Sequence, residues 1–402
     1  MNRFRLILFF LAIYWSLFTH DVSAQEGIVK PEIIESISAN QYDADWYRQQ
    51  AAAWQKVVDA NPEDQWAWRN LFHAINYYDS FSNGFGDNPD ESRTADVIRK
   101  MEATLPDSYV LNLCKTRFCL STDESAKLGD CIRRAVELMP DDAYIDDVER
   151  LACRMWIIDQ KNPIVAELFT KSYKGRHCPA RIMKYNWNML QSMEENAIYF
   201  GNGDNCLVPM KMLQDALGIR KDVTIIPLSY LFEEEYKADL LKALNTPPFT
   251  VQINYSEDWI KQYYADCVMH IIKETGRPAY FFTDVLVQTN IDKDSLYNEG
   301  LLLKYSDHQY DNFAVAMRNV KEVYHLEYLA EPDLEYDSWE TSARMDMNNV
   351  TLLSNLVSKL RDKGDVVQAE RLYAILDACV KRCNIDPEAK ASIAAILKAE
   401  ER

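Results

Sequence analysis

The stretch NAIYFGNGDNCLVPMKMLQDALGIRKDVTIIP, residues 196–227, decides the architecture of the middle of the chain. It begins with a short apolar segment typical of a strand, has helical periodicity up to Gly218, and ends in β-branched residues typical of a second strand. A strand, a helix and a strand in this order form a βαβ unit, whose crossover is expected to be right-handed. The stretch therefore predicts two parallel strands joined by one helix.

The same alternation continues downstream. Helical periodicity over residues 233–244 and 257–275 alternates with strand-like segments at 248–255 and 278–285. This alternation is typical of a sheet that carries helices on both faces. We therefore expect a central α/β domain with mostly parallel strands over residues 196–330.

The region from about residue 40 to residue 195 has helical periodicity throughout, interrupted by turns that contain proline. Pro62, Pro106 and Pro140 stand 44 and 34 residues apart, and 34 residues is the length of a tetratricopeptide repeat. The region resembles that family in its order of helix, "NPED" or "MPDD" turn, and helix. The resemblance implies a curved stack of hairpins that binds proteins or peptides. We expect this helical region to span residues 25–195.

The last part of the chain, residues 331–402, is helical again. Two amphipathic segments flank Gly364, and a glycine in this position is typical of the turn in a helical hairpin. The fold class expected from the whole sequence is therefore a set of N-terminal tetratricopeptide-like hairpins, a central α/β domain and a C-terminal helical hairpin.

Residues 1–24 have the pattern of a cleavable signal peptide. Arg3 and Arg5 precede an apolar run of 13 residues, and Val22 and Ala24 supply the small residues of a cleavage site. The apolar run is shorter than the about 20 residues that a membrane-spanning helix needs. The pattern predicts export to the periplasm or cell envelope, with no transmembrane segment after cleavage. A retained N-terminal anchor is the alternative.

Charge and cysteine usage exclude several functions. The formal net charge is -18 and lysine and arginine do not cluster, so neither nucleic acid nor anionic lipid is expected as a partner. The nine cysteines lack paired CxxC spacing, and the histidines lack HExxH spacing. We therefore expect no metal site and no cofactor.

Polar residues follow three of the predicted strands. If the strands are parallel neighbours, their ends meet at the edge of the sheet where ligands collect, and Asp204 and Asp284 could share a hard cation. The alternative is structural, because Asp and Asn at such positions also cap helices and form turns. No GxGxxG, Walker or GxSxG pattern occurs, so no catalytic residue is predicted. The candidate ligand-binding residues are Asn202, Gly203, Asp204 and Asn205 after the first strand, Ser229 after the second and Asp284 after the third.

Residues 185–231, with GRPAYFFTDV (276–285) and NEGLLLKYS (298–306), resemble the soluble C-terminal region of a bacterial domain of unknown function. That region is found at the end of membrane proteins likened to protein O-mannosyltransferases, and also in exported tetratricopeptide proteins. Cys206 and Leu207 depart from the family pattern, because acidic and hydroxyl residues are typical there. The membrane part, where glycosyl transfer is expected, is not in this sequence, so no transferase activity is expected.

These observations predict an exported binding or scaffolding protein of the bacterial cell envelope, with a protein partner on the helical repeat surface and no catalytic activity. The alternative is a glycan-binding or glycosylation-accessory protein that uses the loop 201–206. A third interpretation makes the α/β domain a spacer that fixes the angle between the helical arms.

Overall fold

The computed structural model describes residues 29–82, 92–121, 125–250, 258–331, 340–382 and 391. The predicted signal peptide lies outside these ranges. Residues 251–257 also lie outside them, and they include most of the strand expected at 248–255. The chain divides into two compact units between Lys171 and Ser172. We call them the helical unit and the sheet unit, and describe each by itself.

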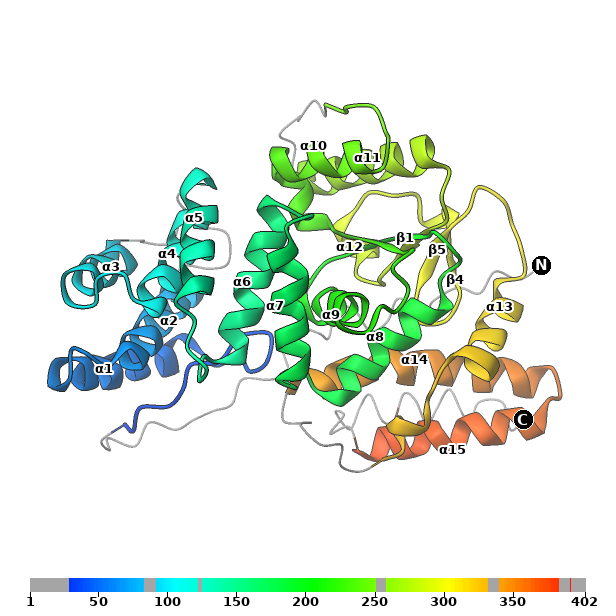
Figure 1. Cartoon of the computed structure of the whole chain (residues 1–402). Helices are drawn as coiled ribbons and strands as arrows, with labels where there is room; N and C mark the ends of the chain where they lie inside the picture. The colour runs from blue at the N-terminus through cyan, green and yellow to red at the C-terminus, as the bar shows by residue number, and fades with distance from the viewer. Residues whose placement is uncertain are drawn as a thin grey trace. The chain divides into compact units, whose positions relative to one another are not determined.

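Helices follow one another through the helical unit from α1 to α7 (Figure 1). Pro62, Pro106 and Pro140 lie in the turns between α1 and α2, α3 and α4, and α5 and α6. The predicted helical hairpins are therefore confirmed. The bounds are α1 (Ala44–Ala60), α2 (Gln65–Ser82), α3 (Ser92–Thr104), α4 (Tyr109–Ser121), α5 (Ser125–Glu137), α6 (Ile145–Ile158) and α7 (Pro163–Lys174).

Side-chain caps explain where the first two helices begin. The Asp43 carboxylate accepts a hydrogen bond from the backbone N–H of Trp46 at 2.7 Å. The Asp64 carboxylate accepts one from the backbone N–H of Trp66 at 2.9 Å. These bonds satisfy backbone donors that have no partner within a helix, so the sequence fixes both starting points locally.

The sheet unit contains a sheet of five strands in the order β2-β1-β3-β5-β4. β1 (Ile198–Gly201) pairs in parallel with β2 (Thr224–Pro227) and β3 (Ala279–Phe281), which confirms the predicted βαβ unit. β5 (Leu303–Tyr305) and β4 (Leu296–Asn298) continue the sheet as antiparallel strands. The sheet expected to be mostly parallel is therefore a mixed one.

Helices lie on both faces of this sheet, and Figure 1 shows α10 and α11 on one side and α8 and α9 on the other. α9 ends at Gly218, whose left-handed φ of 71° is the conformation that glycine supplies at a helix end. α8 packs against α9, so the compact unit begins upstream of the boundary expected at residues 195 and 196. The bounds are α8 (Ala180–Ser192), α9 (Val208–Leu217), α10 (Glu234–Ala243), α11 (Trp259–Thr275), α12 (Val285–Gln288) and α13 (Asn312–Arg318).

The sheet unit ends in the predicted helical hairpin, formed by α14 (Glu340–Asp362) and α15 (Val366–Arg382). Gly364 has a φ of 76°, and the backbone N–H of Asp365 donates to the carbonyl of Leu360 at 2.9 Å to close the turn. In the part of the chain that the structure describes, no helix combines the length and the apolar character needed to cross a bilayer.

Candidate functional site

The ends of three parallel strands meet at one edge of the sheet. β1 is the central strand of the three, with Gly201 opposite Pro227 of β2 and Phe200 opposite Phe281 of β3. All six candidate ligand-binding residues follow these strand ends. We call residues 202–206, 229–230 and 283–284 the strand-end rim. The strand neighbourhood on which the sequence hypothesis depended is therefore present.

The first segment of the strand-end rim is a tight turn held from inside by Cys206. Gly203 has a φ of 89°, and a short 3-10 helix follows at Asp204–Cys206. The buried Cys206 thiol donates to the carbonyl of Asn202 at 2.9 Å. The Asn186 side chain of α8 donates to the carbonyl of Asn205 at 2.8 Å. These contacts of Cys206 and Asn186, which the sequence did not reveal, favour the structural alternative for the turn.

Burial raises the pKa of the Cys206 thiol, and the charge of Asp284 raises it further. The thiol is therefore protonated and serves as a hydrogen-bond donor, not as a nucleophile, because the thiolate is the reactive form. The sequence analysis treated Cys206 only as the loss of a ligand oxygen. In the structure it replaces that oxygen with a donor that points into the turn.

The candidate side chains differ in their access to solvent. Asp204 and Ser229 are exposed, whereas Asn202, Asn205 and Asp284 are partly buried. Among the described residues no group of three or more His, Cys, Asp or Glu side chains could hold a metal ion. Asp204 and Asp284 alone fall short of the six to eight oxygen ligands that Ca²⁺ takes. The rim therefore offers polar contacts for an organic ligand better than a cation site.

Asp284 has the most perturbed carboxyl group of the rim. Its Oδ2 accepts a hydrogen bond from Gln288 Nε2 at 3.1 Å. Its Oδ1 is buried and has no hydrogen-bond partner among the described residues. Burial raises the pKa of Asp284 to about 7, although the Val285 backbone N–H and Gln288 oppose the shift. Near neutral pH this carboxyl group can therefore either donate or accept a hydrogen bond.

Aromatic side chains cluster between the short 3-10 helix Leu228–Phe232, which follows β2, and the start of α11. The Phe232 ring stacks on Tyr263 with centroids 4.6 Å apart and meets Trp259 edge-on at 5.9 Å. Phe232 and Trp259 are both partly exposed. Sequence reasoning missed this pair, and the signal available was an aromatic residue at the end of the 3-10 helix Leu228–Phe232 and another at the start of α11. The strand-end rim supplies carboxylate, amide and hydroxyl groups, and Phe232 lies two residues beyond its 229–230 segment.

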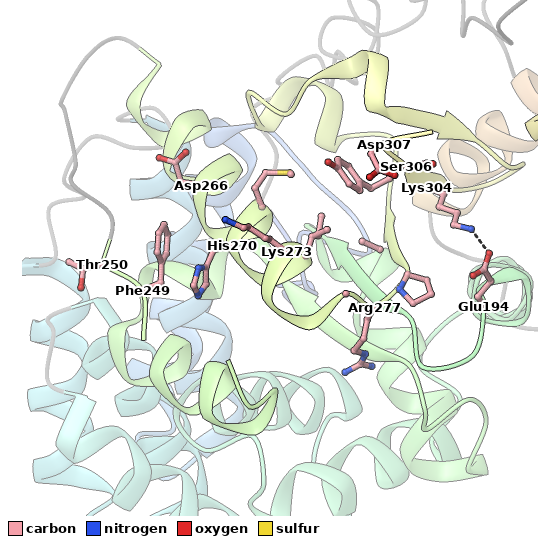
Figure 2. A pocket seen from close by; sticks show the side chains of 16 residues that line it. Glu194, Phe249, Thr250, Asp266, His270, Lys273, Arg277, Lys304, Ser306 and Asp307 are labelled. Carbon is pink, nitrogen blue, oxygen red and sulfur yellow. Dashed lines mark hydrogen bonds and ion pairs between the residues drawn. The ribbon is translucent and has the colours of Figure 1, made fainter. Parts of the chain in front are cut away.

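A cavity lies at the end of the sheet where β3 begins, opposite the strand-end rim. This cavity of about 1030 Å³ is lined by residues of α11, by the start of β3 and by the end of β5, and no candidate ligand-binding residue lines it. Figure 2 shows Lys304 paired with Glu194 on one side and the His270 ring beside Phe249 on the other. The His270 and Phe249 rings stack at 4.4 Å.

Two residues that line this cavity contact the backbone of the protein itself. The Arg277 guanidinium donates to the carbonyls of Asn196 at 2.6 Å and Ala197 at 3.1 Å, where β1 begins. His270 Nε2 lies 3.1 Å from the Pro247 carbonyl oxygen. Arg277 and His270 are thus engaged in the fold. The residues that the sequence indicated for a ligand lie at the strand-end rim and not in this cavity, so the rim is retained as the candidate site of the sheet unit.

A second cluster of charges, in the helical unit, was also missed by sequence reasoning. Arg69 of α2 holds Asp147 of α6 through two hydrogen bonds of 2.9 Å, and also reaches Asp146 at 3.2 Å. Arg150 donates to Asp146 at 2.9 Å. Arg69 is 1% exposed and Asp147 is fully buried. The partners lie 77 and 78 residues apart in the chain, which no local pattern could reveal.

The charges in this network compensate one another. Burial alone would raise the pKa of Asp147, but the charge of Arg69 and the hydrogen bonds of His73 and Arg69 together outweigh it and hold that pKa well below the ordinary value. Burial, together with the charges of Arg150 and Arg69, lowers the pKa of the neighbouring His73 to about 3. His73 is therefore neutral, and its Nε2 lies 3.6 Å from the Asp147 carboxylate. This network fixes α2 to α6.

Comparisons with known proteins find a match for part of the chain. A family model described as TMEM260-associated domain 2 matches residues 182–363, which is less than half of the chain and contains the strand-end rim. A solved structure of an IFIT1 monomeric mutant with Gppp-AAAA has 14% sequence identity over 82% of this chain and 67% of that chain, with a TM-score of 0.27. A score this low does not support a shared fold. No curated protein matches the chain.

Proposed function

We propose that the chain is a binding or scaffolding protein built on helical hairpins, exported to the bacterial cell envelope and without catalytic activity of its own. The observation that carries the proposal is the network of Arg69, Asp147 and Arg150, which fixes α2 to α6 from within. A stack of hairpins fixed in this way presents a surface of constant shape. Such surfaces bind partner proteins in other stacked-helix folds.

The proposal is tested by cross-linking in cells that express the full chain with a C-terminal affinity tag. We expect the tagged protein in the envelope fraction, with partner cross-links at exposed lysines of the helical unit such as Lys56 and Lys100. Lys221 and Lys242, exposed in the sheet unit, serve as the internal control. Recovery in the cytoplasm, or cross-links confined to Lys221 and Lys242, would contradict the proposal.

A second candidate function is glycan binding at the strand-end rim. The observation in its favour is that partly exposed Phe232, which contacts the partly exposed Trp259 ring, lies two residues beyond the 229–230 segment of the strand-end rim. Ligand sites typically combine aromatic walls with a few convergent polar groups, and a sugar ring offers both an apolar face and hydroxyl groups to such a site. This function uses the loop 201–206 and needs no catalytic group.

Glycan binding is tested by applying the protein to an array of bacterial envelope glycans, followed by calorimetric titration of any hit. We expect Trp259→Ala and Asp204→Ala each to weaken binding by about tenfold or more. Glu235→Gln, an exposed acid on α10, is the matched control and keeps wild-type affinity. Failure of every glycan to bind would eliminate this second function and leave the scaffolding proposal standing.

A further inference from the structure

An extended segment upstream of α1 lies across the first hairpin and is held there mainly through its backbone. We call residues 30–35 the strap. Gln50 Oε1 accepts from the backbone N–H of Glu32 at 2.8 Å, and Gln50 Nε2 donates to the carbonyl of Lys30 at 3.3 Å. The indole of Trp54 donates to the carbonyl of Glu32 at 2.7 Å. Side chains of α1 thus supply the hydrogen bonds to the strap backbone that a neighbouring strand would supply in a sheet.

Ile34 anchors the strap on α2. Its backbone N–H donates to Asn70 Oδ1 at 2.8 Å, and its carbonyl accepts from Arg69 Nη1 at 2.5 Å. The Ile34 side chain is completely buried in a cluster with Tyr47, Ala74 and Tyr77. The anchor therefore combines both backbone polar groups with one aliphatic side chain.

The groups that hold the strap are oriented by other contacts. Asn70 Nδ2 donates to the carbonyl of Trp66 at 2.8 Å, which points Oδ1 toward the strap. The two bonds from Arg69 to Asp147 fix the guanidinium so that Nη1 faces the carbonyl of Ile34. Preorganised donors and acceptors lower the cost of ordering a binding site when a peptide arrives.

Most strap side chains point away from this surface. Ile33 is 51% exposed, and Glu32 and Glu35 are exposed as well. We call the surface that holds the strap the strap face; it is formed by Gln50, Trp54, Arg69 and Asn70. This surface therefore recognises an extended backbone and a single aliphatic side chain. Recognition of this kind tolerates many sequences, because backbone bonds supply the affinity and one pocket supplies the selectivity.

We propose that the strap face is a peptide-binding site that the strap occupies within its own chain. Its partner is an extended segment of another protein, with a β-branched aliphatic residue at the position of Ile34. The partner segment competes with the strap, so the free chain is held in a closed state. This inference rests on the proposed binding role of the helical unit and names the site and the chemistry of its partner.

The first experiment uses a fluorescent peptide with the sequence of residues 29–40 and the full chain. We expect the Ile34→Asp chain to bind this peptide at least about tenfold more tightly than the wild-type chain does, because its own strap no longer competes. A peptide carrying Ile34→Asp should lose this binding, whereas the Ile33→Asp peptide, altered at the exposed neighbour, should keep it. Adding Asn70→Ala to the Ile34→Asp chain should abolish binding of the unaltered peptide.

The second experiment keeps the native strap. A protease recognition sequence is inserted after Asn40, the full chain is cleaved there, and exchange of the cut strap for the fluorescent peptide is followed by anisotropy. We expect exchange, with the helical circular dichroism unchanged. Unfolding on cleavage, a strap that does not exchange, or binding that ignores Ile34 would each overturn the inference. In each of these cases, partner cross-links at Lys56 and Lys100 would still uphold the scaffolding proposal.

Discussion

The two units bury carboxylates in opposite ways. In the helical unit, Asp146 and Asp147 lie against Arg69 and Arg150, and each accepts charge-assisted hydrogen bonds. At the strand-end rim, Asp284 has a buried Oδ1 with no partner among the described residues. The pKa of Asp147 is therefore lowered and that of Asp284 is raised.

The difference separates a group that maintains the fold from one that is free to act. A buried carboxylate held by two arginines has no capacity left for a ligand, and its removal damages the structure. A buried carboxyl oxygen without a hydrogen-bond partner lowers the free energy of unfolding, so such a group does not serve to stabilise the fold. Comparing the two units by mutation therefore tests which charges support the structure and which belong to a site.

The largest effect is expected at Arg69. Arg69→Met keeps most of the side-chain volume but leaves Asp147 buried without its main partner, so it should destabilise the helical unit by about 3–5 kcal/mol. Urea denaturation followed by circular dichroism measures the loss. Arg48→Met, which removes an exposed pair with Asp45, is the matched control and should leave the midpoint unchanged. Equal midpoints for Arg69→Met and wild type would show that the network is not structural.

His73 should make the helical unit sensitive to acid. Its pKa is about 3 in the folded protein and near 6.5 when unfolded, so its contribution is present above pH 6.5 and is lost as pH falls from 6.5 toward 3. The loss is on the order of 2–4 kcal/mol. Unfolding free energies between pH 7 and pH 4 measure it, and His73→Gln should flatten the profile. The exposed His308→Gln variant should keep the wild-type slope.

Asp284 should give the opposite slope. Because its pKa is raised from 3.8 to about 7 on folding, the native state binds the proton more tightly, and stability falls as pH rises from 4 to 7. Asp284→Asn should remove this slope and stabilise the protein at pH 8 by on the order of 1–3 kcal/mol. Denaturation of the sheet unit at several pH values measures both. A destabilised Asp284→Asn variant at pH 8 would place Asp284 among the structural charges instead.

The smallest effect is expected at Cys206. Cys206→Ala removes the donor to the carbonyl of Asn202 and should cost about 1–2 kcal/mol, whereas Cys206→Ser keeps a donor and should cost less. Thermal unfolding of the two variants measures the difference. If Cys206→Ser were the less stable of the two, the hydrogen bond could not be what holds the turn.

Elements that carry their own periodicity could be predicted from the sequence. The apolar run of β1, the helical period of α9 up to Gly218 and the β-branched run of β2 each specify their structure locally. β4 and β5 could not be predicted, because each has three residues that mix apolar and polar side chains, whereas the equally short β3 lies in an apolar run that follows a helix. The same locality explains why the turns at Pro62, Pro106 and Pro140 were found.

The chemistry of the sites was less accessible, because it depends on contacts between distant residues. The sequence indicated that Asp204 and Asp284 follow strands, but the structure was needed to show that these strands are neighbours and that Asp204 is exposed while Oδ1 of Asp284 is buried. From the sequence, Cys206 was interpreted only as the loss of a ligand oxygen, and its hydrogen bond to the carbonyl of Asn202 became visible in the structure. Arg69 gave no signal at all, since its partner Asp147 is 78 residues away.

That separation along the chain limits how far the helical hairpins behave as modules. In an ideal repeat array each unit depends only on its neighbours, so an end can be removed without unfolding the rest. Here α1 and α2 bury a guanidinium whose counter-charges arrive only with α6. A chain that stops before Asp146 would lack the counter-charges of Arg69, so we expect its first hairpin to be less stable than in the full chain. We therefore expect α2 and α6 to unfold together.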